Sequence, residues 1–462
     1  MIFRTALALL AAATVAMAKT NFVLIFCDDL GYGDLSCFGH PTIHTPNLDR
    51  LANEGQKWTN FYAAASVCTP SRAGLLTGRL PIRNGMCSSK RRVLFPDSAK
   101  GMPESEITVA EALKGAGYAT AMVGKWHLGH LPEYLPTANG FESYYGVPYS
   151  NDMDRIAGLG PTGRAGLMKP KSEYWNVPLM HNTEILERSP NQSYLTRNYT
   201  QQAVAYIESQ AKSEKPFFLY LAHSMPHVPI FASGAFSGTS QAGRYGDVIE
   251  EIDWSVGQVV KTLQAQGIDD ETVVVFTSDN GPWLPFKTHG GSAGHLRDGK
   301  GSTWEGGMRE PTVFWGPGNV EAGIVHEMGS TLDIFATFLD LAGVALPDDR
   351  TYDGASLAPV LAGRGHSPRQ EMFYYHGSEL YAVRKGEYKL HFTTKTEYMG
   401  QKPTKHESPV LYHLGEDPGE KFDLAKENPE VVEAMVKLAD THKGSFTPPE
   451  SQLEARIARG AN

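Results

Sequence analysis

The sequence has 462 residues, of which 41% are hydrophobic, 20% are charged and 10% are aromatic. This balance is typical of a globular protein and excludes a disordered chain, a collagen-like chain and a coiled coil. The 42 Lys and Arg residues are outnumbered by 51 Asp and Glu residues, so the formal net charge of −9 gives the whole chain no attraction to nucleic acid. Four Cys residues are too few for a disulfide framework in a chain of this length.

The first segment, residues 1–18, has the pattern of a secretory signal peptide. Arg4 precedes an apolar run, and residues 16–18 (AMA) match the small-residue pattern of a cleavage site. The alternative is a membrane anchor, but the run is short for a bilayer, and no later segment of the sequence is apolar enough to span one. We expect the mature protein to begin at Lys19 and to be exported, either to the periplasm or out of the cell.

Beyond this leader, short apolar runs alternate with helical patterns. The runs are residues 22–26 (FVLIF), 119–123 (ATAMV), 217–221 (FFLYL) and 272–276 (TVVVF). Their length and uniform apolar character predict strands buried on both faces. Thr45 and Pro46 predict the start of one helix, which ends at Gly55, and Thr108 with Glu111 has the spacing of a capping box. This alternation predicts an α/β fold with a large, mostly parallel sheet sandwiched by helices.

The C-terminal part of the chain has a different pattern. From about Glu371 the apolar segments are short, aromatic and partly alternating, which predicts a small antiparallel sheet, and residues 429–442 predict a closing helix. The stretch 363–369 is rich in Gly, Ser, Pro and Arg and suits a boundary. We therefore expect a catalytic domain over residues 19–365 and a subdomain over 366–462.

Polar residues follow each of the four buried runs. In chain order these residues are Asp28, Asp29, Lys125, His127, His227, Asp279 and Asn280. Each group alone is explained by a turn, a helix cap or a structural histidine. Because ligand sites in open α/β sheets lie beyond the carboxyl ends of the strands, their joint occurrence favours one shared crevice.

The residue types in this set suit an oxyanion ester and a divalent cation. Asp28, Asp29, Asp279 and Asn280 offer the hard oxygen ligands that Ca²⁺ or Mg²⁺ prefers. Lys125 and Lys300 add positive charge, and the two His side chains can carry protons near neutral pH.

Cys68 has an unusual setting. Pro70 is well placed to open a helix, which puts Cys68 at a helix N-terminus where an anion is favoured, and Arg72 adds a planar donor fork for a tetrahedral oxyanion. The ordinary alternative is a buried free thiol.

The motif at residues 68–72 (CTPSR), followed by 76–79 (LTGR), resembles the C-x-P-S-R motif of the formylglycine-dependent (type I) sulfatases. Further family segments follow the same order at residues 28–34 (DDLGYGD), 45–49 (TPNLD), 124–129 (GKWHLG), 278–281 (SDNG) and 305–311 (EGGMREP). The resemblance covers nearly the whole mature chain and is greatest to the arylsulfatase A and N-acetylgalactosamine-6-sulfatase branch. It implies an alkaline-phosphatase-like fold.

The resemblance also implies two cofactors. Cys68 is expected to be converted to formylglycine (3-oxoalanine) by a formylglycine-generating or an anaerobic sulfatase-maturating enzyme. One Ca²⁺ is expected to be held by Asp28, Asp29, Asp279 and Asn280, together with the modified residue 68.

By the same resemblance, Arg72 stabilises the hydrated formylglycine, and Lys125 and Lys300 bind sulfate oxygens. Ser150 stands near the position at which the arylsulfatase A branch places a sulfate-contacting serine. His227 is expected to bind the ester as well.

The implied proton transfers use three further assignments. Asp279 accepts the proton of the attacking hydroxyl, His227 is the general acid for the leaving alcohol, and His127 is the base that expels sulfate. Such groups, with cations around the sulfuryl group, lower the barrier to ester cleavage.

Two alternatives stay open from the sequence: another alkaline-phosphatase-like enzyme, such as a phosphoesterase or phosphonate hydrolase, and a non-catalytic glycan-binding relative. For a sulfatase, the polar and aromatic loops suit a sulfated carbohydrate. The branch points to a galactose or N-acetylgalactosamine sulfate of a glycosaminoglycan or algal galactan. The sequence leaves open the sulfate position, exo or endo action, the oligomeric state and whether Cys37 and Cys87 pair.

Overall fold

The computed structural model describes residues 20–396 and 402–458. The expected signal peptide, residues 1–18, and the expected start at Lys19 lie outside the described residues. Within the described part, no helix is both long enough and apolar enough to cross a bilayer.

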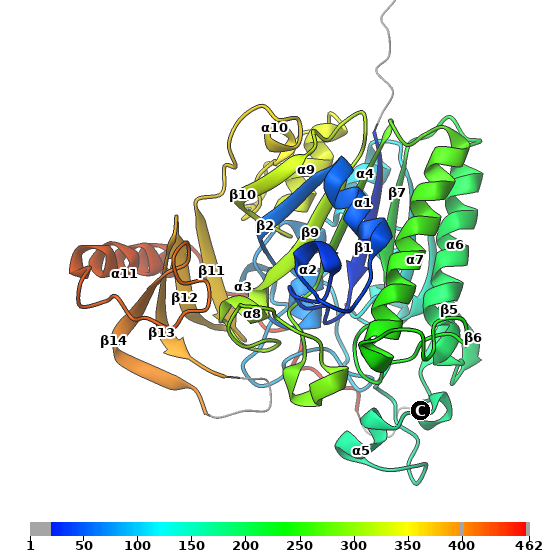
Figure 1. The fold of residues 1–462 in the computed structure, drawn as a ribbon, viewed down its shortest axis with the longest axis horizontal. Helices are drawn as coiled ribbons and strands as arrows, with labels where there is room; N and C mark the ends of the chain where they lie inside the picture. Colours follow the sequence, from blue (N-terminus) through cyan, green and yellow to red (C-terminus); the bar gives the residue numbers. More distant parts are fainter. Residues whose placement is uncertain (1–19, 397–401, 459–462) are drawn as a thin grey trace, which may run out of the picture.

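A ten-stranded sheet runs through the main body of the molecule (Figure 1). In sheet order its strands are β10 (Gly323–Ser330), β2 (Gln56–Tyr62), β9 (Arg309–Trp315), β8 (Thr272–Ser278), β1 (Asn21–Cys27), β7 (Phe217–Ala222), β3 (Ala119–Lys125), β4 (Ser143–Val147), β5 (Pro178–His181) and β6 (Glu184–Arg188). The four apolar runs are the neighbouring strands β8, β1, β7 and β3, which are parallel to one another and buried along their whole length. The predicted mostly parallel sheet is confirmed.

Helices cover both faces of this sheet (Figure 1). Within the described residues the α-helices are α1 (Pro46–Glu54), α2 (Cys68–Thr77), α3 (Pro81–Asn84), α4 (Val109–Gly115), α5 (Gly163–Met168), α6 (Leu195–Gln210), α7 (Gly243–Gln266), α8 (Glu305–Met308), α9 (Asp333–Leu341), α10 (Ala358–Leu361) and α11 (Pro429–Gly444). Because side chains alternate along a strand, Val23 and Ile25 of β1 pack with α1, α6 and α7, whereas Phe22 and Leu24 pack with α2, α4 and α9. The sheet therefore separates two hydrophobic cores.

Strand β9, which lies between β2 and β8 inside the sheet, departs from the parallel pattern. β9 is antiparallel to both β2 and β8, and it contains Pro311, which has no N–H for a ladder hydrogen bond. The register with β2 shifts between Trp58 and Phe61, opposite the proline, so the irregularity falls where the donor is missing.

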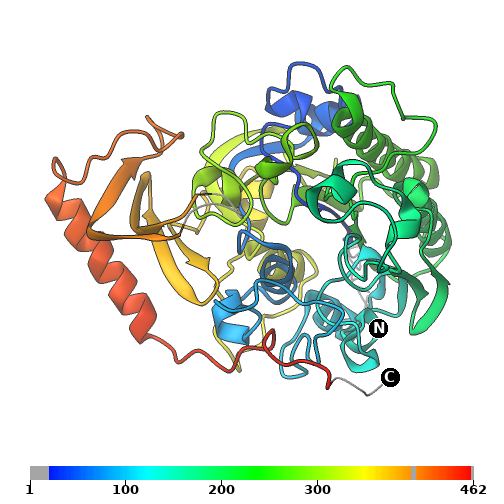
Figure 2. The same ribbon diagram turned by 90° about the horizontal axis from the view of Figure 1, so that it is seen from below.

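The C-terminal part forms a second, four-stranded antiparallel sheet of β11 (Glu371–His376), β12 (Glu379–Lys385), β13 (Tyr388–Thr394) and β14 (Thr404–His413), as predicted. Helix α11 packs on it and ends two residues beyond the expected 429–442. Figure 2 shows the residues after α11 returning beneath the main body, where Gln452 N donates to Gly85 O at 2.8 Å. The domain boundary expected at residues 365 and 366 stays a prediction.

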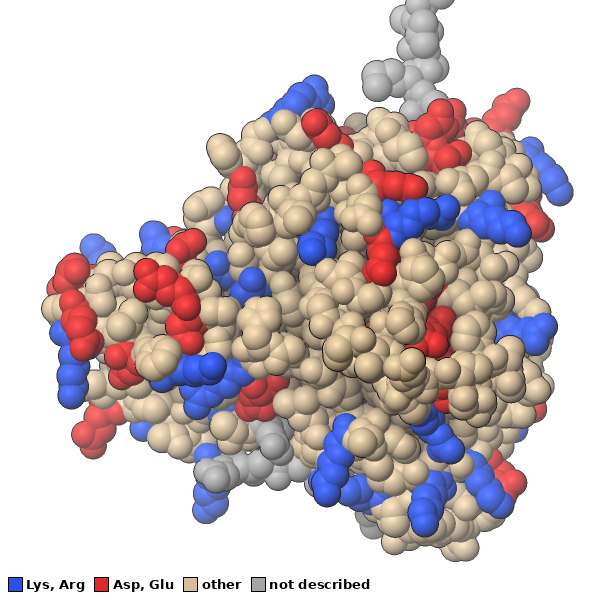
Figure 3. All heavy atoms as spheres, viewed as in Figure 1, with Lys and Arg blue, Asp and Glu red and all other residues tan. Residues whose placement is uncertain are grey.

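Charges of both signs are interspersed on the face drawn in Figure 3. Attraction of an anionic ligand to this protein therefore depends on local groups of basic side chains rather than on the net charge of −9.

Candidate active site

The polar residues that follow the central strands meet in one buried cluster at the carboxyl ends of those strands. Asp28 and Asp29 follow β1, Lys125 ends β3, and Asp279 and Asn280 follow β8. All five side chains are at most 2% exposed. The structure thus brings together groups that are up to 252 positions apart in the sequence, from Asp28 to Asn280.

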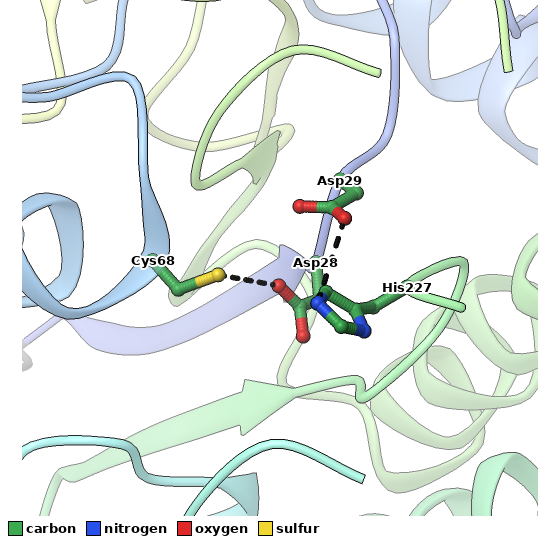
Figure 4. Close-up of side chains that lie close together, drawn as sticks. All are labelled: Asp28, Asp29, Cys68 and His227. Carbon is green, nitrogen blue, oxygen red and sulfur yellow. Dashed lines mark hydrogen bonds and ion pairs between the residues drawn. The ribbon is translucent and has the colours of Figure 1, made fainter. Parts of the chain in front are cut away.

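Cys68 is the first residue of α2, at the N-terminal end expected from Pro70. Its Sγ atom points toward the carboxylate that follows β1 (Figure 4): it donates to Asp28 Oδ1 at 3.2 Å and lies 3.5 Å from Lys300 Nζ. Burial, together with the charges of Asp279 and Asp28, raises the pKa of this thiol well above its ordinary value. The encoded cysteine is therefore a protonated thiol and a weak nucleophile.

Three basic side chains hold the carboxylates of the cluster in place. Arg72 donates to Asp279 Oδ2 from Nη2 at 2.9 Å and from Nε at 3.1 Å, and Lys300 Nζ donates to Asp29 Oδ1 at 2.6 Å. Lys125 Nζ donates to Asp28 Oδ2. Burial opposes ionisation of Asp28, but the neighbouring positive charges, Lys125 first, hold its pKa well below the usual range.

Two buried oxygens of the cluster lack a hydrogen bond. Asp29 Oδ2 and Asn280 Oδ1 have no hydrogen-bond partner among residues 20–396 and 402–458. Burial raises the pKa of Asp29 to about 6, and burial with the nearby Asp28 charge raises that of Asp279 to about 7. A hard cation bound here would give the unpartnered oxygens a partner. Its positive charge would also lower the pKa of the two carboxyl groups and so favour their ionised forms.

Four side chains of the cluster bring metal-ligating atoms close together. Ligand atoms of Asp28, Asp29, Cys68 and His227 all lie within 4.8 Å of one another (Figure 4). Asp279 and Asn280, which contact Asp29 in the same cluster, add further oxygen donors, and oxygen donors suit Ca²⁺ or Mg²⁺.

The two histidines differ in which ring nitrogen donates to a backbone carbonyl. His127 Nε2 contacts Leu94 O at 2.9 Å, so this nitrogen carries the proton. His127 Nδ1 is then a buried lone pair, with no hydrogen-bond partner in the part of the chain that the structure describes. In His227 the proton is on Nδ1, which donates to Val228 O at 2.6 Å, and Nε2 faces Asp29 Oδ2 at 3.7 Å. Burial lowers the pKa of both imidazoles well below the ordinary value.

Ser150, expected from the resemblance alone, also lies in the cluster. Lys125 Nζ donates to its Oγ at 3.3 Å, and His227 Nδ1 lies 3.5 Å from the same atom. Every residue expected at the site is therefore in or beside this cluster, and their individual catalytic roles stay predictions.

Sequence reasoning missed two neighbours of the cluster. Tyr220 lies inside the apolar run of β7, and its hydroxyl is 3.5 Å from Arg72 Nη1; the one polar atom in a buried strand was the available signal. Trp283 follows the Asp279 and Asn280 pair, and its ring centroid lies 4.5 Å from Lys300 Nζ and 5.3 Å from the centroid of the His227 ring. Cys37 and Cys87, whose pairing was left open, are both free.

Comparison with known proteins agrees with this geometry. The family model named Sulfatase matches residues 20–344, and that for the C-terminal region of aryl-sulfatase matches residues 367–459. The chain is 41% identical over 465 residues to human (Homo sapiens) arylsulfatase A, covering 94% of this chain and 90% of that protein. It is 41% identical over 487 residues to N-acetylgalactosamine-6-sulfatase of Mus musculus, covering 97% and 90% of the two chains.

Solved structures show the same architecture. PsFucS1 sulfatase from Pseudoalteromonas sp. superposes with a TM-score of 0.82 at 27% identity, covering 95% of this chain and 92% of that one. Ps i-CgsB in complex with k-i-k-neocarrahexaose gives 0.79 at 28% identity, covering 96% and 95%. The fold is the alkaline-phosphatase-like fold of the sulfatases, as expected. The chain belongs to the sulfatase family and is a sulfuric ester hydrolase.

Proposed function

We propose that this protein hydrolyses a sulfate monoester of a carbohydrate, using formylglycine formed from Cys68 and one bound Ca²⁺. The observation that carries the proposal is the position of Cys68 Sγ, 3.2 Å from Asp28 Oδ1 and 3.5 Å from Lys300 Nζ. A residue at this point meets both the expected metal ligands and the expected sulfate-binding cations.

Conversion of Cys68 to formylglycine would supply chemistry that the encoded thiol lacks. A buried, protonated thiol is a weak nucleophile, and its sulfated form has no second hydroxyl with which to expel sulfate. Hydrated formylglycine supplies two hydroxyls, one to attack sulfur and one to release it. Arg72, fixed by Asp279 and by Lys125 O at 3.0 Å, is rigid and close enough to orient the modified side chain.

The metal would be held by Asp28, Asp29, Asp279 and Asn280, with residue 68 as a further ligand. An ion held there by these oxygens would supply positive charge to the sulfate group and would favour the ionised form of a hydroxyl at residue 68. The two unpartnered oxygens, Asp29 Oδ2 and Asn280 Oδ1, support this assignment over a site without metal.

Lys125 lies at the end of β3, and Lys300 lies in the loop before α8. We assign both lysines to binding the oxygens of the sulfate group. Each is now paired with one carboxylate, Lys125 with Asp28 and Lys300 with Asp29. An ammonium group has three donors, so one lysine can bind a carboxylate and a substrate oxygen together. Ser150, 3.3 Å from Lys125 Nζ, can add a hydroxyl donor.

The proton carriers follow from the observed ring orientations. His127 keeps an unpaired Nδ1 lone pair because Nε2 donates to Leu94 O, so it suits the base that takes a proton from residue 68. His227 must carry a proton on Nε2 to act as the acid for the leaving alcohol. Burial, and after it the positive charge of Lys300, lowers the pKa of His227. A sulfate ester placed between the two lysines brings negative charge that offsets the repulsion from Lys300 and so favours the protonated imidazole. Asp279 is assigned as acceptor of the first proton.

We infer the class of substrate from the names of similar proteins. Proteins 41% identical to this chain include an N-acetylgalactosamine-6-sulfatase, and Ps i-CgsB was solved with a neocarrahexaose. We propose a galactose or N-acetylgalactosamine sulfate of a glycosaminoglycan or an algal galactan. We also propose export through the leader at residues 1–18, maturation by a formylglycine-generating or anaerobic sulfatase-maturating enzyme, and the domain division at residues 365 and 366.

The test is a comparison of matched esters. Sulfate and phosphate monoesters of the same sugar, in galacto and gluco configurations, are assayed with the enzyme made in a host that matures sulfatases. We expect higher kcat/KM for the sulfate ester of the galacto sugar. Faster turnover of the phosphate ester would favour a phosphoesterase, and a preference for gluco sugars would contradict the substrate assignment.

A further inference from the structure

The loop of residues 297–305, which carries Lys300, packs against the C-terminal sheet. The centroid of its Trp304 ring lies 4.4 Å from that of the His391 ring in β13 and 5.7 Å from that of the Tyr412 ring in β14. Helix α8, which begins where the loop ends, lies at the junction of the main body and the C-terminal sheet (Figure 1). A lysine that we assign to sulfate binding therefore lies on a loop that the second sheet supports.

Glu420, in the segment that follows β14, contacts both ends of this loop. Its Oε2 accepts from the backbone N of Glu305 at 2.7 Å, and its backbone O accepts from Arg297 Nη1 at 2.6 Å. The Arg297 guanidinium lies 3.7 Å from the centroid of the Trp304 ring, and Gly306 N donates to Arg297 O at 2.8 Å. The beginning and the end of the loop are therefore joined to each other and to Glu420.

Glu420 is itself held in one conformation. Its side chain is 0% exposed, and its Oε1 lies 2.7 Å from His391 Nε2 and 3.1 Å from Lys389 Nζ, both in β13. Its backbone has a φ of +51°, in the left-handed region that non-glycine residues rarely adopt, and its N donates to Asp417 O at 3.0 Å. A buried carboxylate with charged and backbone partners gives the loop a fixed point of attachment on the C-terminal sheet.

Between its two ends, the loop is also attached on the side of the active site. Lys300 N donates to Pro282 O at 2.9 Å, and Gly301 N donates to the backbone O of Ser66, two residues before Cys68, at 2.8 Å. The Lys300 residue is only 4% exposed, so its ammonium group is enclosed by the cluster that it serves. A displacement of about 1 Å in such a site is enough to lose much of the effect of a group on the rate.

We propose that Glu420 is a positioning residue for Lys300, because it holds both ends of residues 297–305 and so keeps the ammonium group where the sulfate oxygens bind. The proposal rests on the proposed function, in which Lys300 binds sulfate, and gives the C-terminal sheet a part in that step. Glu420 acts only through the loop, since its carboxylate is enclosed by the loop and by side chains of β13.

The first experiment measures the attachment of the loop without any use of activity. Hydrogen–deuterium exchange, read by mass spectrometry, compares the native protein with Glu420→Ala. We expect exchange in residues 297–306 to become several-fold faster, with β1 and β8 unchanged, because only a local opening is made easier. Unchanged exchange in the loop, or an equal rise in the loop and in both strands, would overturn the proposal.

A second variant and a matched control accompany this measurement. Arg297→Ala removes the contact to Glu420 O but keeps the buried carboxylate with its partners, so it decides by the same criteria if Glu420→Ala does not fold. Glu387→Ala, in the turn between β12 and β13, also removes a carboxylate that faces a histidine, at 3.3 Å from His413 Nε2, but this side chain is 65% exposed. We expect the Glu387 variant to leave both loop exchange and activity unchanged.

A double-mutant cycle then tests whether the attachment acts through Lys300. The kcat/KM for a sulfate ester is measured for Glu420→Ala in the native protein and in the Lys300→Ala variant. We expect a loss of about tenfold to hundredfold in the first case and of less than about twofold in the second, because no ammonium group is left to misplace. Equal losses in the two backgrounds would assign Glu420 to stability alone and overturn the proposal. Full activity of Lys300→Ala, together with faster loop exchange in Glu420→Ala, would contradict the proposed function and still support attachment of the loop by Glu420.

Discussion

Replacement of Lys389 by methionine is the sharpest test of how the two sheets are joined. Lys389 lies in β13, and its Nζ is 2.9 Å from Glu305 Oε1 and 3.1 Å from Glu420 Oε1, with all three side chains 0% exposed. Glu420 also accepts from the backbone N of Glu305 at 2.7 Å. Burial opposes ionisation of Glu305, but Lys389 and nearby arginines lower its pKa to about 2, so the carboxylate stays charged.

Lys389→Met removes a buried positive charge that both Glu305 and Glu420 contact, so two buried carboxylates lose one of their partners. Breaking a buried pair in this way costs about 3–5 kcal/mol of the free energy of unfolding, against about 0–1 kcal/mol for an exposed pair. The matched control is Lys385→Met in the neighbouring strand β12, whose Nζ pairs with Glu371 at 3.0 Å while 57% of its side chain is exposed.

Urea unfolding at neutral pH measures both variants. We expect Lys389→Met to lose several kcal/mol more than Lys385→Met, and adding Glu305→Gln to recover part of that loss because one buried charge is removed as well. Equal stabilities of the two lysine variants would refute the reasoning.

Three further predictions concern the site. Lys300→Ala should lower kcat/KM by about 10²–10³, as for removal of one group that stabilises developing charge, with an unchanged circular dichroism spectrum; a loss below twofold would contradict sulfate binding by Lys300. His227→Ala should slow an alkyl sulfate more than 4-nitrophenyl sulfate, since only the poor leaving group needs the acid, and equal slowing would remove His227 from that role. Chelation with EDTA should lower both activity and Tm, and Ca²⁺ should restore them, with a stabilisation of about 2.7 kcal/mol at 100 times Kd. No change in Tm on chelation would argue against a metal held by Asp28, Asp29, Asp279 and Asn280.

The sequence predicted the centre of the fold because the signals there are local. The uniform apolar runs of β1, β3, β7 and β8 and the capping box of Thr108 and Glu111 require no knowledge of distant residues, and all are present in the structure. The positions of Asp28 and Asp279 followed from the rule that parallel strands share one carboxyl edge.

Features that depend on tertiary contacts were beyond that reasoning. β2 carries Lys57, Thr59 and Asn60 among its apolar residues, and β9 contains Pro311, so neither reads as a strand of the main sheet. The lone pair of His127 depends on the carbonyl of Leu94, which lies on a loop with no motif. Thr45 precedes α1 as expected, but its side chain caps no backbone group of the helix; instead it donates to Asp49 at 3.2 Å.

The central claim is that Cys68 is the precursor of the catalytic residue. Mass spectrometry of the tryptic peptide spanning residues 58–72, from protein made in its native host, tests this directly. We expect an aldehyde or its hydrate at residue 68, with the aldehyde lighter than the encoded thiol form, in a fraction that tracks sulfatase activity between preparations. A wholly unmodified thiol in fully active protein would contradict the account.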